Sequence, residues 1–185
     1  MQRLVLDVDA LAHASGLGLL SHIEVLISGL PERAYMERSA YTEAIRTGLG
    51  RVLEDWQRKG LLKDPVDYRT LAREGDAQFR EARRQWPGLS KADRATLVVA
   101  RLLGDSGVLT CEGELSAAVT AARILAVDLF DVIRFGVRDG RITRGTAAEL
   151  CAVWDGDRFS AGRPRGYRGS FEAEWAARED LKPLP

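Results

Sequence analysis

The sequence has few of the residues that most often bind transition metals or form disulfides. Its 185 residues include two cysteines and two histidines. Cys111 and Cys151 stand outside any CxxC or Cys/His spacing, which argues against a zinc site. Two isolated cysteines also do not define a disulfide framework, and this suits a reducing compartment. We therefore expect a cytoplasmic protein.

The chain also lacks an excess of charge of one sign and a long hydrophobic run. Lysine and arginine together number 27, as do aspartate and glutamate, so any basic surface for nucleic acid must be local. No stretch approaches the ~18 consecutive apolar residues of a membrane span, and the acidic N-terminus does not suit a signal peptide. We expect no membrane partner. With 45% hydrophobic residues, the chain can bury the core of a globular domain.

Short apolar runs alternate with helical patterns along the chain. This alternation predicts an α/β protein of three layers, in which a short, mainly parallel central sheet is flanked by helices. The predicted strands cover residues 3–6, 33–36, 107–110 and 123–127. Ser90 is expected to cap a helix over 91–103, and Asp128 to cap the helix after the fourth strand. Ser39 is expected to cap a helix that carries Glu43 in or just beyond its first turn.

We predict one domain over residues 1–155, with an enlarged helical insertion at 50–88, and a C-terminal tail at 156–185. The stretch 156–170 is rich in glycine and arginine and poor in aliphatic residues. This composition predicts an extended or disordered segment when the tail is alone. The rest of the tail allows one short helix around Phe171.

Four acids at the ends of predicted elements are the candidate functional residues. They are Asp7, Glu43, Asp93 and Glu112. Asp7 ends the first strand, and ligands of open parallel sheets bind outside the carboxyl ends of strands. Each acid also has an ordinary structural explanation, as a helix cap or as a partner of a helix dipole. The joint placement favours function, because acids from distant segments at one sheet edge suit a divalent cation.

The segments that carry these acids resemble the PIN domain family, and within it the bacterial and archaeal nucleases related to toxins of toxin–antitoxin pairs. That family begins with a hydrophobic strand, an Asp and a polar residue two positions on, and LVLDVDAL matches with Asp7 and Asp9. Its second acid is a Glu at a helix start, and SAYTE matches with Glu43. Its third acid opens an apolar helix, and KADRATLVVARLLG matches with Asp93.

The fourth region of the family is a strand that ends in Thr before one or two acids. VLTCE matches this region with Thr110 and Glu112. The family usually has Asp here, often as a pair, whereas this chain has Cys111-Glu112, and Glu reaches one methylene further. We interpret Cys111 as a packing residue rather than a nucleophile. The likeness covers residues 1–155.

The resemblance implies a divalent-metal-dependent endoribonuclease that cuts single-stranded RNA and uses Mg²⁺ or Mn²⁺. It implies Asp7 and Asp93 as the main metal ligands, with Glu43 and Glu112 orienting waters or holding a second ion. The auxiliary residues would be Asp9, Thr110 and Glu114. The resemblance also implies a toxin-like protein with a small antitoxin as its partner, and a homodimer.

Several basic residues are candidates for nucleic-acid binding. They are Lys91, Arg94, Arg163, Arg165 and Arg168. The alternatives are a solvated helix face for the first two and an arm that folds onto a partner protein for the tail. Two other functions stay open. One is a PIN-like binding or regulatory module without cleavage, suggested by Cys111-Glu112, and the other is a small α/β protein that acts through protein contacts of its tail.

Overall fold

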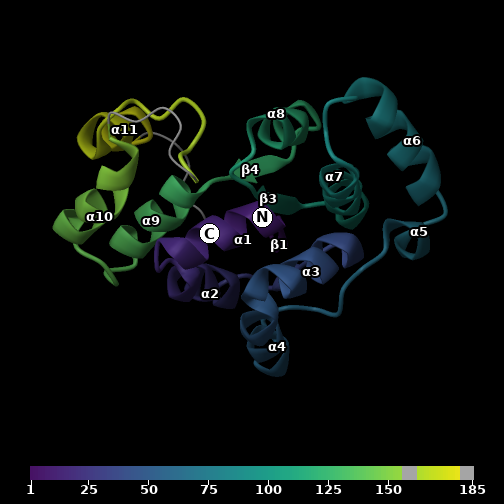
Figure 1. Cartoon of the computed structure of the whole chain (residues 1–185), viewed down its shortest axis with the longest axis horizontal. Coiled ribbons are helices and arrows are strands. Elements are labelled where there is room, and N and C mark those ends of the chain that lie inside the picture. The colour runs from purple at the N-terminus through teal and green to yellow at the C-terminus, as the bar shows by residue number, and fades with distance from the viewer. Residues whose placement is uncertain (156–161, 180–185) are drawn as a thin grey trace.

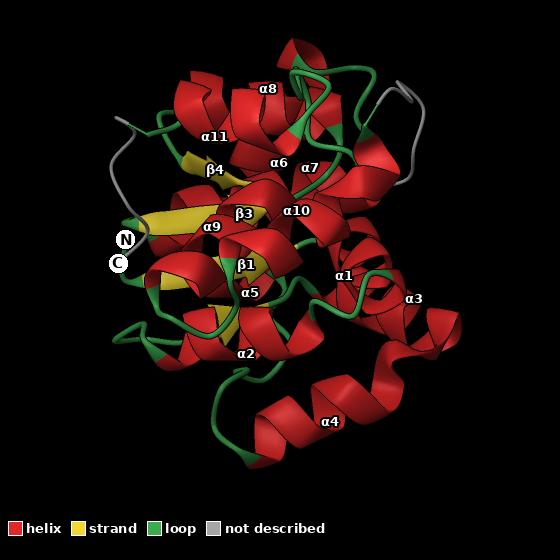
Figure 2. Cartoon of the chain, turned by 90° about the vertical axis from the view of Figure 1, so that its left-hand side faces the viewer, coloured by secondary structure: helices red, strands yellow, loops and turns green. Residues whose placement is uncertain are grey.

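The computed structural model describes residues 1–155 and 162–179 and contains a sheet of four parallel strands. The strands are β1 (Arg3–Leu6), β2 (Ala34–Tyr35), β3 (Ser106–Leu109) and β4 (Leu125–Val127), and they lie in the order β2-β1-β3-β4. Figure 2 shows these strands between layers of helices. The α/β class and the parallel sheet predicted from the sequence are confirmed.

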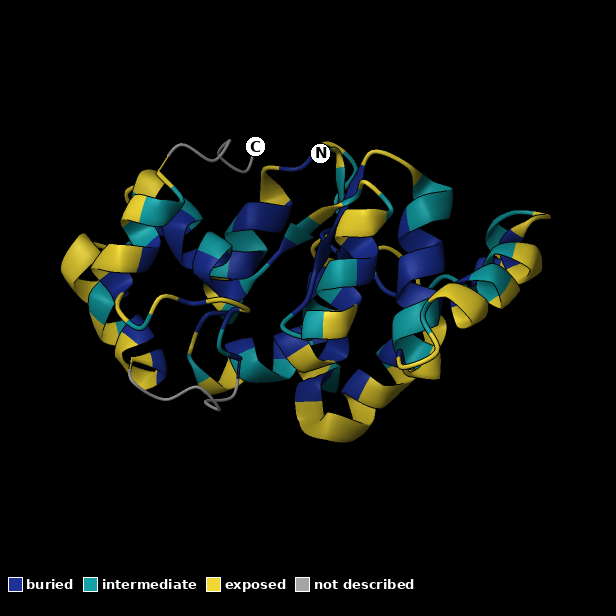
Figure 3. Cartoon of the chain, turned by 90° about the horizontal axis from the view of Figure 1, so that it is seen from above, coloured by how far each residue is buried: buried dark blue, intermediate teal, exposed yellow. Residues whose placement is uncertain are grey.

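Helices cover both faces of the sheet (Figure 1). One face, with Leu4 and Leu6, packs against α1 (Val8–Gly16), α2 (Leu20–Ser28), α3 (Arg38–Ala44), α4 (Gly50–Arg58), α9 (Leu129–Arg138) and α10 (Arg144–Cys151). The other face, with Val5 and Val108, packs against α5 (Tyr68–Leu71), α6 (Gly75–Gln85), α7 (Lys91–Leu103) and α8 (Gly113–Ala121). Figure 3 shows the strands as the buried centre between these layers. Burial on both faces explains the unbroken apolar run of β1. No helix within the described ranges is long and apolar enough to cross a membrane.

The helix starts decide where the polar side chains near the sheet point. Ser90 caps α7 in a capping box with Asp93, and Asp128 caps α9, as predicted. The prediction for α3 was wrong, because Glu37 rather than Ser39 is the N-cap. A carboxylate oxygen of Glu37 accepts hydrogen bonds from Ser39 N at 2.6 Å and from Ala40 N at 3.3 Å. Glu43 therefore lies near the end of α3, not in its first turn.

The central part of the chain adds helices to one end of the molecule. A π-helical turn (Ile45–Leu49) joins α3 to α4, and the connector after α4 pairs with the β2 edge at Leu62 and Val66. Helices α5 and α6 pack on α7, and the rings of Tyr68 and Phe79 stack with centroids 4.7 Å apart. This packing sets the start of α7, and hence Asp93, at the carboxyl edge of the sheet.

The described part of the tail packs on the domain. Tyr167 and Phe171 belong to the same core as β1, and the Tyr167 hydroxyl donates to Asp155 Oδ1 at 2.7 Å. A helix, α11 (Phe171–Ala177), follows and contacts α10. Residues 162–170 therefore pack on the domain and are not an isolated extension. The Tyr167 ring supplies the apolar area for this contact, which the average composition of the segment does not reveal. The remaining positions of the predicted extended segment, 156–161, lie outside the described residues.

Candidate metal centre

Asp7 lies at the centre of the candidate site, directly after β1. Its backbone amide donates to Leu109 O at 3.1 Å, and its side chain is buried. The chain leaves β1 for β2 on one side and later returns as β3 on the other side, so strand order changes direction between β1 and β3. Ligands of open parallel sheets bind at such points. Thr110 Oγ1 donates to Asp7 Oδ2 at 3.0 Å and so joins the two strand ends.

The pKa of Asp7 is raised to about 7. Burial is the largest cause, because a buried carboxylate loses its hydration. The charge of Asp93 raises this pKa further, the charges of Asp9 and Glu112 add to it, and the hydrogen bond from Thr110 lowers it. Acids from three separate segments of the chain are therefore within electrostatic reach of Asp7.

Glu112 is the second acid whose surroundings disfavour its charge. Burial raises its pKa most, the charge of Asp93 raises it further, and the backbone of Leu115 opposes these effects. Its Oε2 is buried and has no hydrogen-bond partner among the residues that the structure describes. A buried acceptor without a partner costs about 1 to 3 kcal/mol. A cation at this atom would remove that cost.

Asp9, Glu43 and Asp93 line one groove of about 410 Å³ at the carboxyl edge of the sheet. The groove's other lining residues are Val8, Ser39, Ser90, Lys91 and Ala92. Glu43 therefore shares this groove with Asp9 and Asp93 although it lies near the end of α3, whereas Asp7 and Glu112 are not among the lining residues. Asp93 also keeps its structural role, since its Oδ2 accepts from Ser90 N at 3.1 Å. The sequence predicts Ser39 and Ser90 only as helix caps, because no local pattern indicates that they border a groove.

The chemistry of these residues suits a hard divalent cation, but their side chains are not placed to bind one as they stand. Within the described ranges, no three His, Cys, Asp or Glu side chains are grouped closely enough to hold a metal ion. Binding therefore requires the acids to rotate toward one another. The donors are carboxylate oxygens, which Mg²⁺ and Mn²⁺ prefer. The unpartnered Oε2 of Glu112 and the raised pKa of Asp7 both indicate a site short of positive charge.

Two of the other predicted residues, Glu114 and Arg94, are not among the residues that line the groove. A Cβ on Gly88 would stand 2.2 Å from Glu114 Oε1, so the Glu114 carboxylate lies against the loop before α7. The Arg94 guanidinium lies 5.9 Å from the centre of the Phe79 ring. Its Nε is buried without a partner among the described residues. Lys91, in contrast, is exposed and borders the groove.

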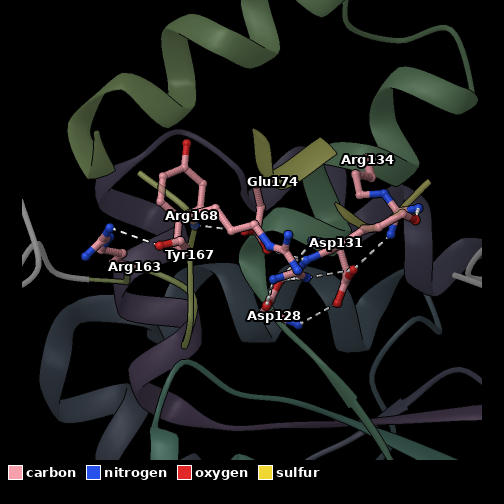
Figure 4. A network of polar contacts seen from close by, with 8 residues as sticks. Asp128, Asp131, Arg134, Arg163, Tyr167, Arg168 and Glu174 are labelled. Carbon is pink, nitrogen blue, oxygen red and sulfur yellow. Dashed lines mark hydrogen bonds and ion pairs between the residues drawn. The ribbon is translucent and has the colours of Figure 1, made fainter. Parts of the chain in front are cut away.

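The three tail arginines that are candidates for nucleic-acid binding differ in their surroundings. Arg163 lies over the Tyr167 ring, 5.3 Å from its centre, and donates to Tyr167 O at 3.1 Å, as Figure 4 shows. Arg168 is exposed, and its backbone amide donates to Glu174 Oε2 at 2.9 Å. Arg165 Nη1 donates to Gly113 O at 2.9 Å, next to Glu112. Arg165 is therefore the tail arginine with a contact beside the acids.

Cys111 lies between Thr110 and Glu112 and is partly buried. Burial raises the pKa of its thiol far above the usual range, and the carboxylates of Asp128 and Asp7 raise it further. A thiol that stays protonated is a poor nucleophile. This environment agrees with a packing role for Cys111.

Comparisons with models of known protein families, with curated proteins and with solved structures give no match. The resemblance to PIN domains therefore rests on the residues of this chain. The function has to be argued from the acid cluster, which consists of Asp7 and the acids whose charges act on it, Asp9, Asp93 and Glu112.

Proposed function

We propose that this protein is a divalent-metal-dependent endoribonuclease of the PIN type that cleaves single-stranded RNA. The observation that carries the proposal is the cluster of acids around Asp7, whose pKa is raised to about 7 by burial and by carboxylates from other segments. Such a cluster destabilises the fold when no cation balances it. Strongly perturbed carboxyl groups at a ligand-binding edge of a sheet are typical of functional sites.

Each residue has a distinct part in the proposed site. A bound Mg²⁺ or Mn²⁺ would activate the attacking water and stabilise charge on the phosphate. Asp7 and Asp93 would be its main ligands, and Glu112 would offer the Oε2 that has no partner in the described residues. Glu43, across the groove, would orient a water or hold a second ion. The antitoxin partner, the toxin-like role and the homodimer are proposed from the family resemblance alone.

A cleavage assay tests this function. Wild-type protein with Mn²⁺ is expected to cut a fluorescently labelled single-stranded RNA, and EDTA is expected to stop the reaction. Glu112→Gln and Asp93→Asn should each lose about 100-fold or more in rate, since each removes a charge that acts on the centre. Glu149→Gln is the matched control, because Glu149 is exposed in α10 and has no part in the proposed site. Cleavage that survives equally in every variant would show a contaminating nuclease, and the proposal would be abandoned.

Thr110→Val should weaken metal binding without removing a ligand. The Thr110 hydroxyl donates to Asp7 and accepts from Glu112 N at 3.0 Å, so valine loses both contacts at nearly constant volume. We expect the dissociation constant for Mn²⁺ to rise about 10-fold, as for other residues that orient metal ligands. Isothermal titration calorimetry measures this change. Thr120→Val is the control, because among the described residues that hydroxyl bonds within its own helix, to Ser116 O at 2.9 Å. Equal affinities in both variants would remove Thr110 from the site.

A binding module without cleavage is the second candidate. Cys111-Glu112 in place of the family's usual Asp favours it, and so does the absence of three grouped metal-binding side chains in the described residues. Calorimetry separates the two functions. Uptake of Mn²⁺ at millimolar concentration or below supports the nuclease, whereas RNA binding that is the same in EDTA and in Mn²⁺, without cleavage, supports the module.

A further inference from the structure

The C-terminal arm, residues 162–179, passes beside the acid cluster. Gly162 lies on His13 of α1, where an added Cβ would stand 2.8 Å from His13 Cβ. Three residues later, Arg165 reaches Gly113, the first residue of α8. In Figure 1 this loop runs between α11 and α8. The arm therefore borders the two elements that begin after Asp7 and Glu112.

Arg165 is presented by a fixed turn. Tyr167 N donates to Pro164 O at 3.1 Å, and Gly166 has a φ of +74°, which a type II turn requires at its third position. Pro164 and Tyr167 on either side are buried, while Arg165 at the tip is exposed. The sequence Pro-Arg-Gly-Tyr thus directs one arginine outward from a turn whose neighbours are packed.

The contact with Gly113 leaves most of the Arg165 guanidinium available. Nη1 donates to Gly113 O at 2.9 Å, and Cδ lies 3.5 Å from the position of a Cβ on Gly113. This bond uses one of the five N–H donors of the side chain. Arg163, two residues earlier, is instead turned onto Tyr167. The aliphatic part of the Arg165 side chain lies against Gly113, and its guanidinium still has N–H donors for a ligand.

An RNA strand at this site needs cations beside the acids. The chain has no net charge, and the acid cluster repels a polyanion. Lys91 borders the groove together with Ser39 and Glu43 of α3, on the β2 side of Asp7. Arg165 lies against Gly113, on the β3 side. Guanidinium groups bind phosphate oxygens through paired N–H donors, which suits a backbone clamp.

We propose that Arg165 binds a phosphate of the RNA strand on the β3 side of the acid cluster, so that the C-terminal arm is part of the substrate site. This inference rests on the proposed nuclease function. It assigns a substrate-positioning role to a segment outside the part of the chain that resembles the family. Lys91 would bind the strand on the β2 side.

Fluorescence anisotropy with a labelled oligouridine strand tests the role of Arg165. Binding is measured in the Asp7→Asn background, which prevents cleavage, over a range of salt concentrations. Arg165→Ala should raise the dissociation constant about 5- to 20-fold and lower the slope of log K against log salt by about 0.7. Arg165→Lys should retain most of the slope. In the wild-type background, Arg165→Ala should raise KM, with kcat and Mn²⁺ affinity nearly unchanged.

Arg138→Ala is the matched control, because Arg138 is exposed in the last turn of α9, the helix that leads away from the carboxyl end of β4. If the wild type cleaves RNA but Arg165→Ala binds it as Arg138→Ala does, the inference is wrong and the nuclease stands. Loss of Mn²⁺ affinity in Arg165→Ala would indicate a structural role through Gly113 and would also overturn the inference. If the wild type neither binds nor cuts RNA, both proposals fail.

Discussion

Asp7→Asn is expected to abolish metal-dependent cleavage and, without metal, to make the protein more stable at pH 8. The pKa of Asp7 is raised from 3.8 to about 7, chiefly by burial and next by Asp93. Between these pH values the folded protein holds a proton that the unfolded chain has released, so the stability of the wild type falls as pH rises. The loss amounts to roughly 2 to 4 kcal/mol, and asparagine, which does not ionise, avoids it.

Urea unfolding in EDTA at pH 5 and pH 8 measures the stability effect. At pH 5 about a third of the difference should already be present, because the unfolded wild-type chain has released the Asp7 proton that the folded protein keeps, and the difference should be largest at pH 8. Asp64→Asn is the control for replacing a carboxylate by an amide at an exposed position. Mn²⁺ at about a thousand times its dissociation constant should cancel or reverse this difference, since it then adds about 4.1 kcal/mol to the wild type alone. If the wild type were more stable than Asp7→Asn at pH 8 in EDTA, the interpretation of Asp7 as a buried acid crowded by other carboxylates would be wrong.

Cleavage measured on the same two proteins separates stability from activity. A loss of about 1,000-fold or more in a variant that is equally or more stable assigns the effect to the lost ligand. Activity that persists in Asp7→Asn would mean that the reaction does not use this centre.

The fold was predictable because its main signals are local. The run of β1 is apolar since both faces of the sheet are covered, and Ser90 with Asp93 forms a capping box that the spacing alone identifies. The start of α3 was not predictable in this way. Glu is not among the preferred N-caps, and Glu37 takes the role because the pairing of Val66 with the end of β2 fixes the backbone there.

The individual residues of the candidate site could be predicted from the sequence, but their arrangement in space could not. Asp7 and Glu112 each follow a strand, but their approach depends on β1 and β3 being neighbours, which no local pattern states. The contact of Arg165 with Gly113 spans 52 residues of sequence. The Pro-Arg-Gly-Tyr turn can be recognised from the sequence, whereas the surface it faces cannot.

Arg178→Met is expected to be the most destabilising substitution in the arm. Arg178 binds Asp128 through both Nη atoms at 2.9 and 2.8 Å, Asp131 Oδ1 at 3.0 Å and Glu174 Oε1 at 2.6 Å. Its side chain is 12% exposed and lies over the Phe130 ring. Figure 4 shows the side chains of Asp128, Asp131 and Glu174 gathered in this network. Methionine fills the space but leaves three carboxylates without this cation, and removing one partner of a buried ion pair costs about 3 to 5 kcal/mol.

Urea unfolding at pH 7 measures this loss, with Arg144→Met as the matched control. Arg144 also connects α10 to α11, through Glu172 at 2.6 Å and the Trp175 ring at 4.7 Å, but its side chain is 51% exposed, so its loss should cost at most about 1 kcal/mol. The deficit of Arg178→Met should shrink as pH falls toward 4, because burial and the charge of Asp128 already raise the pKa of Asp131 to about 6, and loss of the Arg178 cation would raise it further.

The same substitution links the fold of the arm to its proposed use. If the network of Arg178 holds the arm beside α8, Arg178→Met should raise KM for RNA as Arg165→Ala does, and Mn²⁺ uptake should persist because Asp7, Asp93 and Glu112 are untouched. Equal stability of Arg178→Met and Arg144→Met would show that aromatic packing around Phe171 holds α11 without the ion pairs. A large loss of stability with an unchanged KM would separate the arm from RNA binding, because its anchoring would then serve the fold alone.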